Sequence, residues 1–217
     1  MSREAELRAE IVRVCTRLYD RGLIAGPDGN VSARLGQGRL LVTPTGLSKV
    51  DVRSEDLVVL DEEGQVVSGS HPASSEVRLH LRIYRRRPDV HAVVHAHPPT
   101  ATAFAVAGED FMAPVLPELI LQVGGVPLVP YVTPGSDALA SQFESFLPHH
   151  DAFLMSNHGA TTIGPSLTIA HQRMESLEHA ARILAVARQL GHVRTLTDAE
   201  AAELHARRMG RAGPGRE

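Results

Sequence analysis

Cysteine is almost absent from this sequence: Cys15 is the only one among 217 residues, which excludes a disulfide framework. A lone thiol suits a reducing compartment. Long apolar runs are also missing, since no segment approaches the roughly 20 residues that a membrane-spanning helix needs. The N-terminal stretch MSREAELRAE is charged and lacks the apolar segment of a signal peptide. We therefore expect a soluble, cytoplasmic protein without a membrane partner.

An excess of one charge is lacking as well, because 22 basic residues stand against 25 acidic ones and the net charge is −3. This balance gives no reason to expect nucleic acid or an anionic membrane as a partner. The content of 43% hydrophobic and 22% charged residues is ordinary for a globular domain, and the length suits one domain. The unusual number is the count of twelve histidines, which makes their spacing worth examining.

Apolar periodicity predicts helices and short strands mixed along one chain. Helices are expected over residues 7–22, 74–87, 100–106, 137–147 and 166–190, with a last one starting at a Thr197–Glu200 capping box. Strands are expected over residues 39–43, 57–60, 65–67, 90–97, 126–132 and 152–155. This mixture favours an α/β fold with a single sheet flanked by helices. Residues 1–209 would form the domain, and residues 210–217 a disordered tail.

Two histidines, His95 and His97, end the expected strand over residues 90–97. Alternate residues of a strand point to one face, so the two imidazoles project together. Such a pair is half of a typical zinc site. The third ligand is expected from His158, which follows the apolar strand 152–155 and precedes Gly159. Three protein ligands leave an open coordination position, which is the catalytic arrangement.

Other histidine pairings remain open at this point. His91 shares the strand face and offers an alternative pair with His95. The long helix offers a further group of metal-ligating residue types, although it contains no HExxH pattern: His171, Glu175, Glu178 and His179. Five further histidines are expected to be surface or structural residues, namely His80, His149, His150, His192 and His205.

Three segments have the chemistry of phosphate-binding loops. The first is the loop GNVS at residues 29–32, the second is TPTG at residues 43–46, and the third is SSE at residues 74–76. Hydroxyls and free backbone N–H groups at a helix start favour an anion. A carboxylate beside an anion site, as at Glu76, is typical of a general acid/base next to a metal-bound substrate.

These segments, in this order, resemble the class II aldolase/adducin family, and most nearly its L-fuculose-1-phosphate aldolase branch. The matching stretches cover about residues 5–190. They are GNVS at 29–32, LLVTPTG at 40–46, SSE at 74–76, VVHAH at 93–97, GG at 124–125 and NHG at 157–159. The resemblance implies a single three-layer α/β/α domain around a central, mostly antiparallel sheet.

The resemblance also implies a site and an activity. His95, His97 and His158 would hold Zn²⁺, with Mn²⁺ or Co²⁺ as alternatives. Glu76 would be the catalytic acid/base and would also approach the metal. The substrate phosphate would lie among Asn30, Thr45, Gly46, Ser74 and Ser75. The implied reaction is retro-aldol cleavage of a ketose 1-phosphate to dihydroxyacetone phosphate and an aldehyde, carried out by a homotetramer with its site at a subunit interface.

Two departures bear on that activity. Fuculose aldolase has a tyrosine before the GG element where this sequence has Glu118, and a C-terminal tyrosine where this sequence has none after Tyr131. Glu118 is therefore either a second catalytic carboxylate, as in the family's methylthioribulose-1-phosphate dehydratase branch, or a loop carboxylate at a subunit contact. The alternative function is a sugar-phosphate dehydratase or a decarboxylase of a phosphorylated sugar acid. The ribulose-5-phosphate 4-epimerase branch is disfavoured, because it has aspartate at the position of Glu76.

A non-catalytic interaction domain, as in adducin, is a hypothesis of a different class. Such a domain has no need to keep the metal ligands. The three histidines and Glu76 are all present in this sequence and favour an enzyme.

Overall fold

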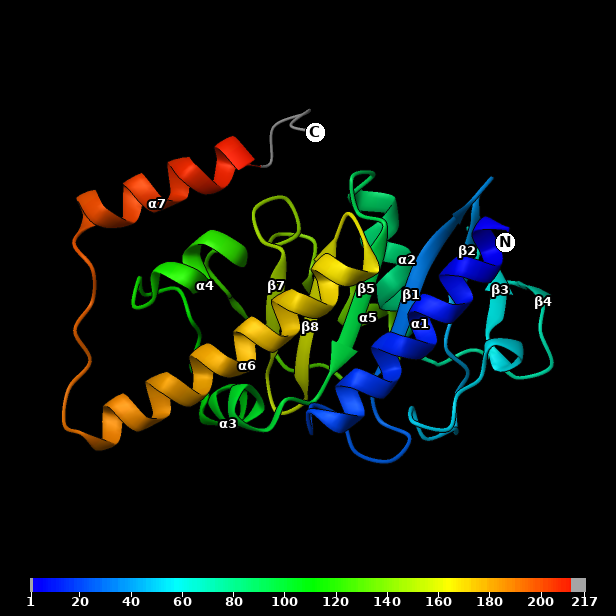
Figure 1. Cartoon of the computed structure of the whole chain (residues 1–217), viewed down its shortest axis with the longest axis horizontal. Coiled ribbons are helices and arrows are strands. Elements are labelled where there is room, and N and C mark those ends of the chain that lie inside the picture. The colour runs from blue at the N-terminus through cyan, green and yellow to red at the C-terminus, as the bar shows by residue number, and fades with distance from the viewer. Residues whose placement is uncertain (1, 212–217) are drawn as a thin grey trace.

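The central sheet organises the computed structural model, which describes residues 2–211 (Figure 1). The strands follow the order β4-β3-β2-β1-β5-β8-β7-β6. Neighbouring strands are antiparallel throughout this sheet except for β6 and β7, which are parallel. Their bounds are β1 Asn30–Gly36, β2 Arg39–Val42, β3 Val58–Leu60, β4 Val66–Ser68, β5 Ala92–Ala96, β6 Leu128–Val129, β7 Ala152–Met155 and β8 Gly159–Gly164.

Helices cover both faces of the sheet and complete the expected three layers (Figure 1). The helices are α1 Arg3–Asp20, α2 Val77–Arg86, α3 Pro99–Ala107, α4 Pro117–Gln122, α5 Asp137–Gln142, α6 Leu167–Gln189 and α7 Asp198–Arg211, with a 3-10 turn η1 at Ser54–Asp56. One core cluster joins α1, α3 and α6 to the sheet, and the other joins α2 and α5 to its opposite face. The mostly antiparallel α/β/α architecture predicted from the sequence is therefore confirmed.

The strand β5 shows how the sequence builds this arrangement. Its residues alternate between the two cores, with Ala92 and Val94 facing one cluster and Val93 facing the other. All five residues of β5 are buried, because the strand lies between β1 and β8 in the middle of the sheet. The strand is therefore a rigid support for any side chain at its end.

The last helix lies away from the sheet and packs on α4 and not on the main core (Figure 1). Its start is the expected capping box, in which the Thr197 hydroxyl accepts from the Glu200 amide and the Glu200 carboxylate accepts from the Thr197 amide. The expected tail over residues 210–217 begins inside α7, and its remainder lies outside the described residues.

Four elements differ from the sequence expectation. Asn30 to Ser32 form the start of strand β1, whereas the segment GNVS was expected to be a loop. The strand β8 and the helix α4 were not expected: β8 contains glycines and an alanine, which are depleted in strands, and α4 has only six residues. Ser74 and Ser75 were expected to be N-cap residues, but Glu76 is the N-cap of α2.

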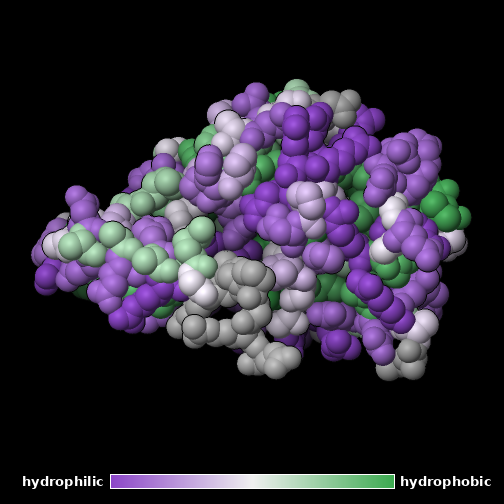
Figure 2. Space-filling view, turned by 90° about the horizontal axis from the view of Figure 1, so that it is seen from above, coloured by the Kyte–Doolittle hydropathy of each residue, from purple (hydrophilic) through white to green (hydrophobic). Residues whose placement is uncertain are grey.

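Among residues 2–211, no helix is both long enough and apolar enough to cross a bilayer. The face drawn in Figure 2 is mainly hydrophilic.

Candidate metal centre and active site

The three predicted histidines lie together at one end of the sheet. His95 is the fourth residue of β5, His97 follows that strand directly, and His158 lies in the turn between β7 and β8. One ring nitrogen from each falls within 4.8 Å of the others. The cluster therefore brings together segments that are about 60 residues apart in the sequence.

Backbone and carboxylate partners fix the orientation of two of these rings. His95 Nδ1 lies 3.0 Å from the Ala160 carbonyl oxygen, and His97 Nδ1 lies 3.4 Å from Asp28 Oδ2. Because a carbonyl or carboxylate oxygen only accepts, each Nδ1 carries the proton and each Nε2 presents a lone pair. These two Nε2 atoms face each other at 3.2 Å. Two lone pairs at that distance fit a shared cation, and this donor set suits zinc or a similar divalent ion.

Burial keeps these imidazoles in the neutral form that ligates metals. It lowers the pKa of His95 to about 3, although attraction from Glu76 opposes the shift. Burial also lowers the pKa of His97, with repulsion from His158 as the next cause. Both rings are therefore deprotonated near neutral pH.

Glu76 lies against the same cluster. Its Oε2 is 3.2 Å from His95 Nε2, and its Oε1 is 3.2 Å from His158 Nε2. The Asn30 amide donates to Oε2 at 2.7 Å. Burial alone raises the pKa of Glu76, but the two imidazoles and the Asn30 amide outweigh it and hold the pKa well below its usual range. The carboxylate is thus placed both to approach the cation and to exchange a proton with a ligand on it.

Backbone conformation explains why the third histidine reaches the cluster. Asn157 adopts a left-handed conformation with φ of 55°, which asparagine tolerates better than most residues. Gly29 has φ of 72°, and a Cβ there would lie 2.7 Å from the His95 carbonyl oxygen. Both tight turns therefore bring the chain close to the histidines only because of these residue types.

The three phosphate-type segments also converge near Glu76. The Asn30–Glu76 hydrogen bond joins the first to the third, and an isolated bridge between Pro44 and Ala73 joins the second to the third. Thr45 and Gly46 are exposed in their loop, as is Ser75, while Ser74 is half-buried. Asn30 Oδ1 is buried without a hydrogen-bond partner among the described residues. Of the five positions expected to bind phosphate, Asn30 is the one with a described hydrogen bond to the Glu76 carboxylate.

Ser32 is separated from that set, contrary to the loop interpretation of GNVS. Its buried hydroxyl lies 2.6 Å from His80 Nδ1 and 2.8 Å from the Tyr84 hydroxyl. His80 is therefore structural, as expected, but it is fully buried.

Glu118 is not brought to the histidines within one chain. It lies in the first turn of α4, where it is exposed, and α4 packs on α6 and α7. No contact described for residues 2–211 joins Glu118 to the cluster. The alternative histidine pairings do not form a metal-binding group either. In the described chain, His95, His97 and His158 are the one group of three or more His, Cys, Asp or Glu residues that could hold a metal ion.

Two residues near the site, Asp28 and Lys49, were not predicted from the sequence. Asp28 looks like a turn residue in the stretch GPDGN, yet it orients His97. Lys49 is buried to 2% exposure next to the same loop, where Nζ donates to Pro27 and Leu47 carbonyl oxygens. A signal was available for Lys49, because it lies three residues after the TPTG segment.

Comparison with known proteins identifies the class. The family described as Class II Aldolase and Adducin N-terminal domain matches residues 9–185, and the chain belongs to this family. The 3-oxo-tetronate 4-phosphate decarboxylase of Escherichia coli (strain K12) is 36% identical over 209 residues, covering 94% of this chain and 97% of that protein. The L-fuculose phosphate aldolase of Methanococcus maripaludis (strain DSM 14266) is 34% identical over 174 residues, covering 80% and 93%.

A solved structure agrees with these relatives. YgbL from Escherichia coli superposes with a TM-score of 0.88 at 35% identity, covering 94% of this chain and all of that one. The protein is thus an enzyme of the class II aldolase superfamily, and the family together with the three-histidine cluster indicates a divalent metal.

Proposed function

We propose that this protein is a metal-dependent decarboxylase of a phosphorylated 3-oxo sugar acid, such as 3-oxo-tetronate 4-phosphate. The observation that carries the proposal is the position of Glu76, whose two carboxylate oxygens contact His95 and His158. The relative that bears this decarboxylase name matches 94% of the chain, which supports the substrate class.

Aldol cleavage and this decarboxylation share one intermediate. In both, a bond next to a carbonyl breaks and its electron pair remains as the enediolate of dihydroxyacetone phosphate. His95, His97 and His158 would hold a divalent ion, which would supply Lewis acidity for the carbonyl. The reactions differ in the leaving group, because an aldehyde forms only after a base removes its hydroxyl proton, whereas CO₂ leaves without losing one.

The positions of the tyrosines in this chain favour decarboxylation over aldol cleavage. Tyr84 is buried and its hydroxyl lies against Ser32, while Tyr19 and Tyr131 are exposed. None of the three has a described contact with the histidine cluster or with Glu76. Among the described residues, the site has Glu76 as a proton donor but no tyrosine that could remove the hydroxyl proton of a leaving aldehyde. This arrangement fits a reaction in which CO₂ leaves.

Glu76 completes the reaction by protonating carbon. The carboxyl group leaves as CO₂, the electron pair moves toward the carbonyl oxygen, and the Glu76 acid then transfers its proton to the enediolate carbon. A substrate between Glu76 and the imidazoles separates the carboxylate from His95 and His158, so burial then favours the protonated acid. Solvent returns one proton to Glu76 in each turnover.

The direct test is to assay the metal-loaded protein with 3-oxo-tetronate 4-phosphate and, separately, with ketose 1-phosphates. We expect equal amounts of CO₂ and dihydroxyacetone phosphate from the first substrate. In D₂O, the product should carry one deuterium on its hydroxymethyl carbon. Release of an aldehyde from a ketose 1-phosphate, without CO₂ from the oxo acid, contradicts the proposal.

Aldol cleavage is the second candidate, and the 34% identity to the Methanococcus maripaludis aldolase supports it. A dehydratase on the same scaffold would instead give a dehydrated diketone. We further propose zinc as the metal, a cytoplasmic location, and a homotetramer in which Glu118 on α4 faces a neighbouring subunit. Metal analysis and the molar mass in solution test the first and third of these.

A further inference from the structure

Lys49 is the only lysine in the chain, although lysine and arginine together number 22. It is also one of the largest fully buried side chains, with an exposure of 2%. Lysine is almost never fully buried unless its charge is compensated. A sequence that otherwise uses arginine for every basic position therefore keeps one ammonium inside the molecule.

The position of this ammonium links two of the phosphate-type segments. Nζ donates to the Pro27 carbonyl oxygen at 2.7 Å and to the Leu47 carbonyl oxygen at 3.0 Å. The segment of Pro27 continues to Asn30, while Leu47 directly follows Thr45 and Gly46. Lys49 thus lies where the two segments meet, behind the donors that they present.

Those donors carry no charge of their own. Asn30, Thr45, Gly46 and the two serines supply hydrogen bonds, but a phosphate monoester carries a charge of roughly −1.5 to −2 at neutral pH. The neighbouring Glu76 makes the potential at this place more negative. Favourable binding of a dianion therefore needs a nearby positive charge.

We propose that Lys49 supplies this charge from behind the two segments and so makes the site selective for phosphorylated substrates. The proposal rests on the proposed function, in which the substrate is phosphorylated, and on the expectation that its phosphate binds at these two segments. Lys49 is a positioning residue: its two carbonyl bonds fix both the segments and the ammonium. Because the group is buried, solvent and salt screen it weakly. The Lys49 ammonium fits between the two carbonyl oxygens.

The surrounding charges agree with this arrangement. Burial lowers the pKa of Lys49, and attraction to neighbouring groups, including Asp28 and Glu76, opposes that shift. A bound phosphate adds to the attraction, so phosphate and the ammonium stabilise each other.

The test measures binding of inorganic phosphate to the full-length, metal-loaded protein by calorimetry. Lys49→Gln and Lys49→Met remove the charge, and Lys49→Arg keeps it. We expect both neutral variants to bind phosphate roughly 10-fold more weakly or worse, and Lys49→Arg to remain within about threefold of the wild type. Acetohydroxamate, a metal chelator without phosphate, is the control ligand and should bind all four proteins equally.

Three outcomes in the neutral variants would overturn the proposal: unchanged phosphate binding, equal weakening of phosphate and acetohydroxamate, or failure of both variants to fold. Absence of phosphate binding by the wild type would also overturn it. The decarboxylase assignment fails separately, since a charge-dependent phosphate site without CO₂ release would contradict only the reaction.

Discussion

The His97 ring lies so close to Gly159 that any side chain at position 159 would overlap with it. A Cβ at position 159 would lie 2.5 Å from His97 Cδ2 and 2.6 Å from the Ala96 carbonyl oxygen. Gly159 also directly follows His158 and is the first residue of β8, so one glycine lies next to two of the three histidines. Substitution there acts on two of the three proposed ligands together.

We therefore expect Gly159→Ala to weaken metal binding roughly 10- to 100-fold, the loss typical when a ligand's support is removed. Competition with a chromogenic chelator measures the affinity. Gly210→Ala is the matched control, because a Cβ there meets no atom within 4 Å. Equal metal affinity in Gly159→Ala and the wild type would show that the ring of His97 moves without cost.

Much of this site could be predicted from local patterns. The period of two along β5 placed His95 and His97 on one face, and the short apolar run of β7 placed His158 just beyond a strand. These are relations between residues that are close in the sequence. The strand signal is strong there because all residues of both strands are buried.

The parts that could not be predicted depend on partners far along the chain. Ser32 looks like a loop hydroxyl until His80 and Tyr84, 48 and 52 residues later, bury it against β1. Asp28 looks like a turn residue until His97 approaches it. No local pattern reports such pairings, since the tertiary fold alone brings the two sides together.

Glu76→Gln should keep the metal and lose turnover. The three histidines retain the ion, but the amide neither gives nor takes a proton, so kcat should fall roughly 10²- to 10⁴-fold. Elemental analysis and steady-state assays check the two halves of this expectation. Glu63→Gln, an exposed position in the β3–β4 turn, should change neither. Substantial turnover by Glu76→Gln would assign the proton transfer to another group.

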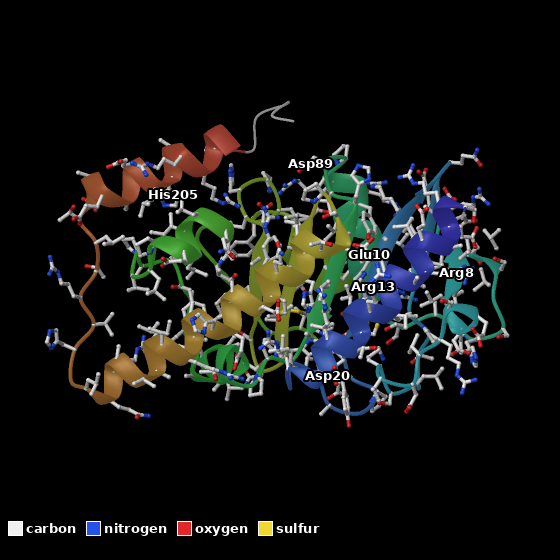
Figure 3. All side chains as sticks on the ribbon, in the orientation of Figure 1. Arg8, Glu10, Arg13, Asp20, Asp89 and His205 are labelled. Atoms are coloured by element: carbon white, nitrogen blue, oxygen red, sulfur yellow. The ribbon has the colours of Figure 1, made fainter. Side chains whose placement is uncertain are left out.

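Asp28→Asn should weaken metal binding although it substitutes none of the three proposed histidine ligands. The carboxylate accepts from His97 Nδ1 and so directs the Nε2 lone pair to the cluster. Loss of this charge should lower metal affinity by roughly 10-fold or more. Asp20→Asn at the exposed end of α1 is the control (Figure 3). If the two variants bind metal equally well, the Asp28 contact does not orient His97.

Histidine 80 should make the metal-free protein less stable in acid. Burial lowers the pKa of His80 to about 4 from its ordinary value of 6.5. Between these values the unfolded chain takes up a proton that the folded chain does not, so the free energy of unfolding falls as the pH falls. The loss from this residue should reach about 3 kcal/mol near pH 4.

Urea denaturation of the metal-free protein at several pH values measures this loss. His80→Gln keeps an acceptor for the Ser32 hydroxyl but does not titrate, so its stability should fall less steeply below pH 6.5. The other buried histidines titrate equally in both proteins and cancel in the comparison. Parallel pH profiles would mean that His80 is protonated in the folded state as easily as in the unfolded one.

Asp151 should be the most costly carboxylate to neutralise outside the metal site. Its oxygens lie 3.0 Å from Arg87, 2.9 Å from Arg173 and 2.5 Å from Arg208. These guanidinium groups come from the end of α2, from α6 and from α7, so one carboxylate, directly before the start of β7, joins three helices. Asp151→Asn would leave three largely buried cations without their shared anion, and we expect a loss of about 3 kcal/mol in unfolding free energy.

Asp89→Asn is the control: its side chain is 63% exposed and its described ion-pair partner is Arg87, so it should cost less than about 1 kcal/mol. Chemical denaturation compares the two, and hydrogen exchange should show faster opening of α7 in Asp151→Asn alone; equal stabilities would place the attachment of α7 in its contacts with α4 instead.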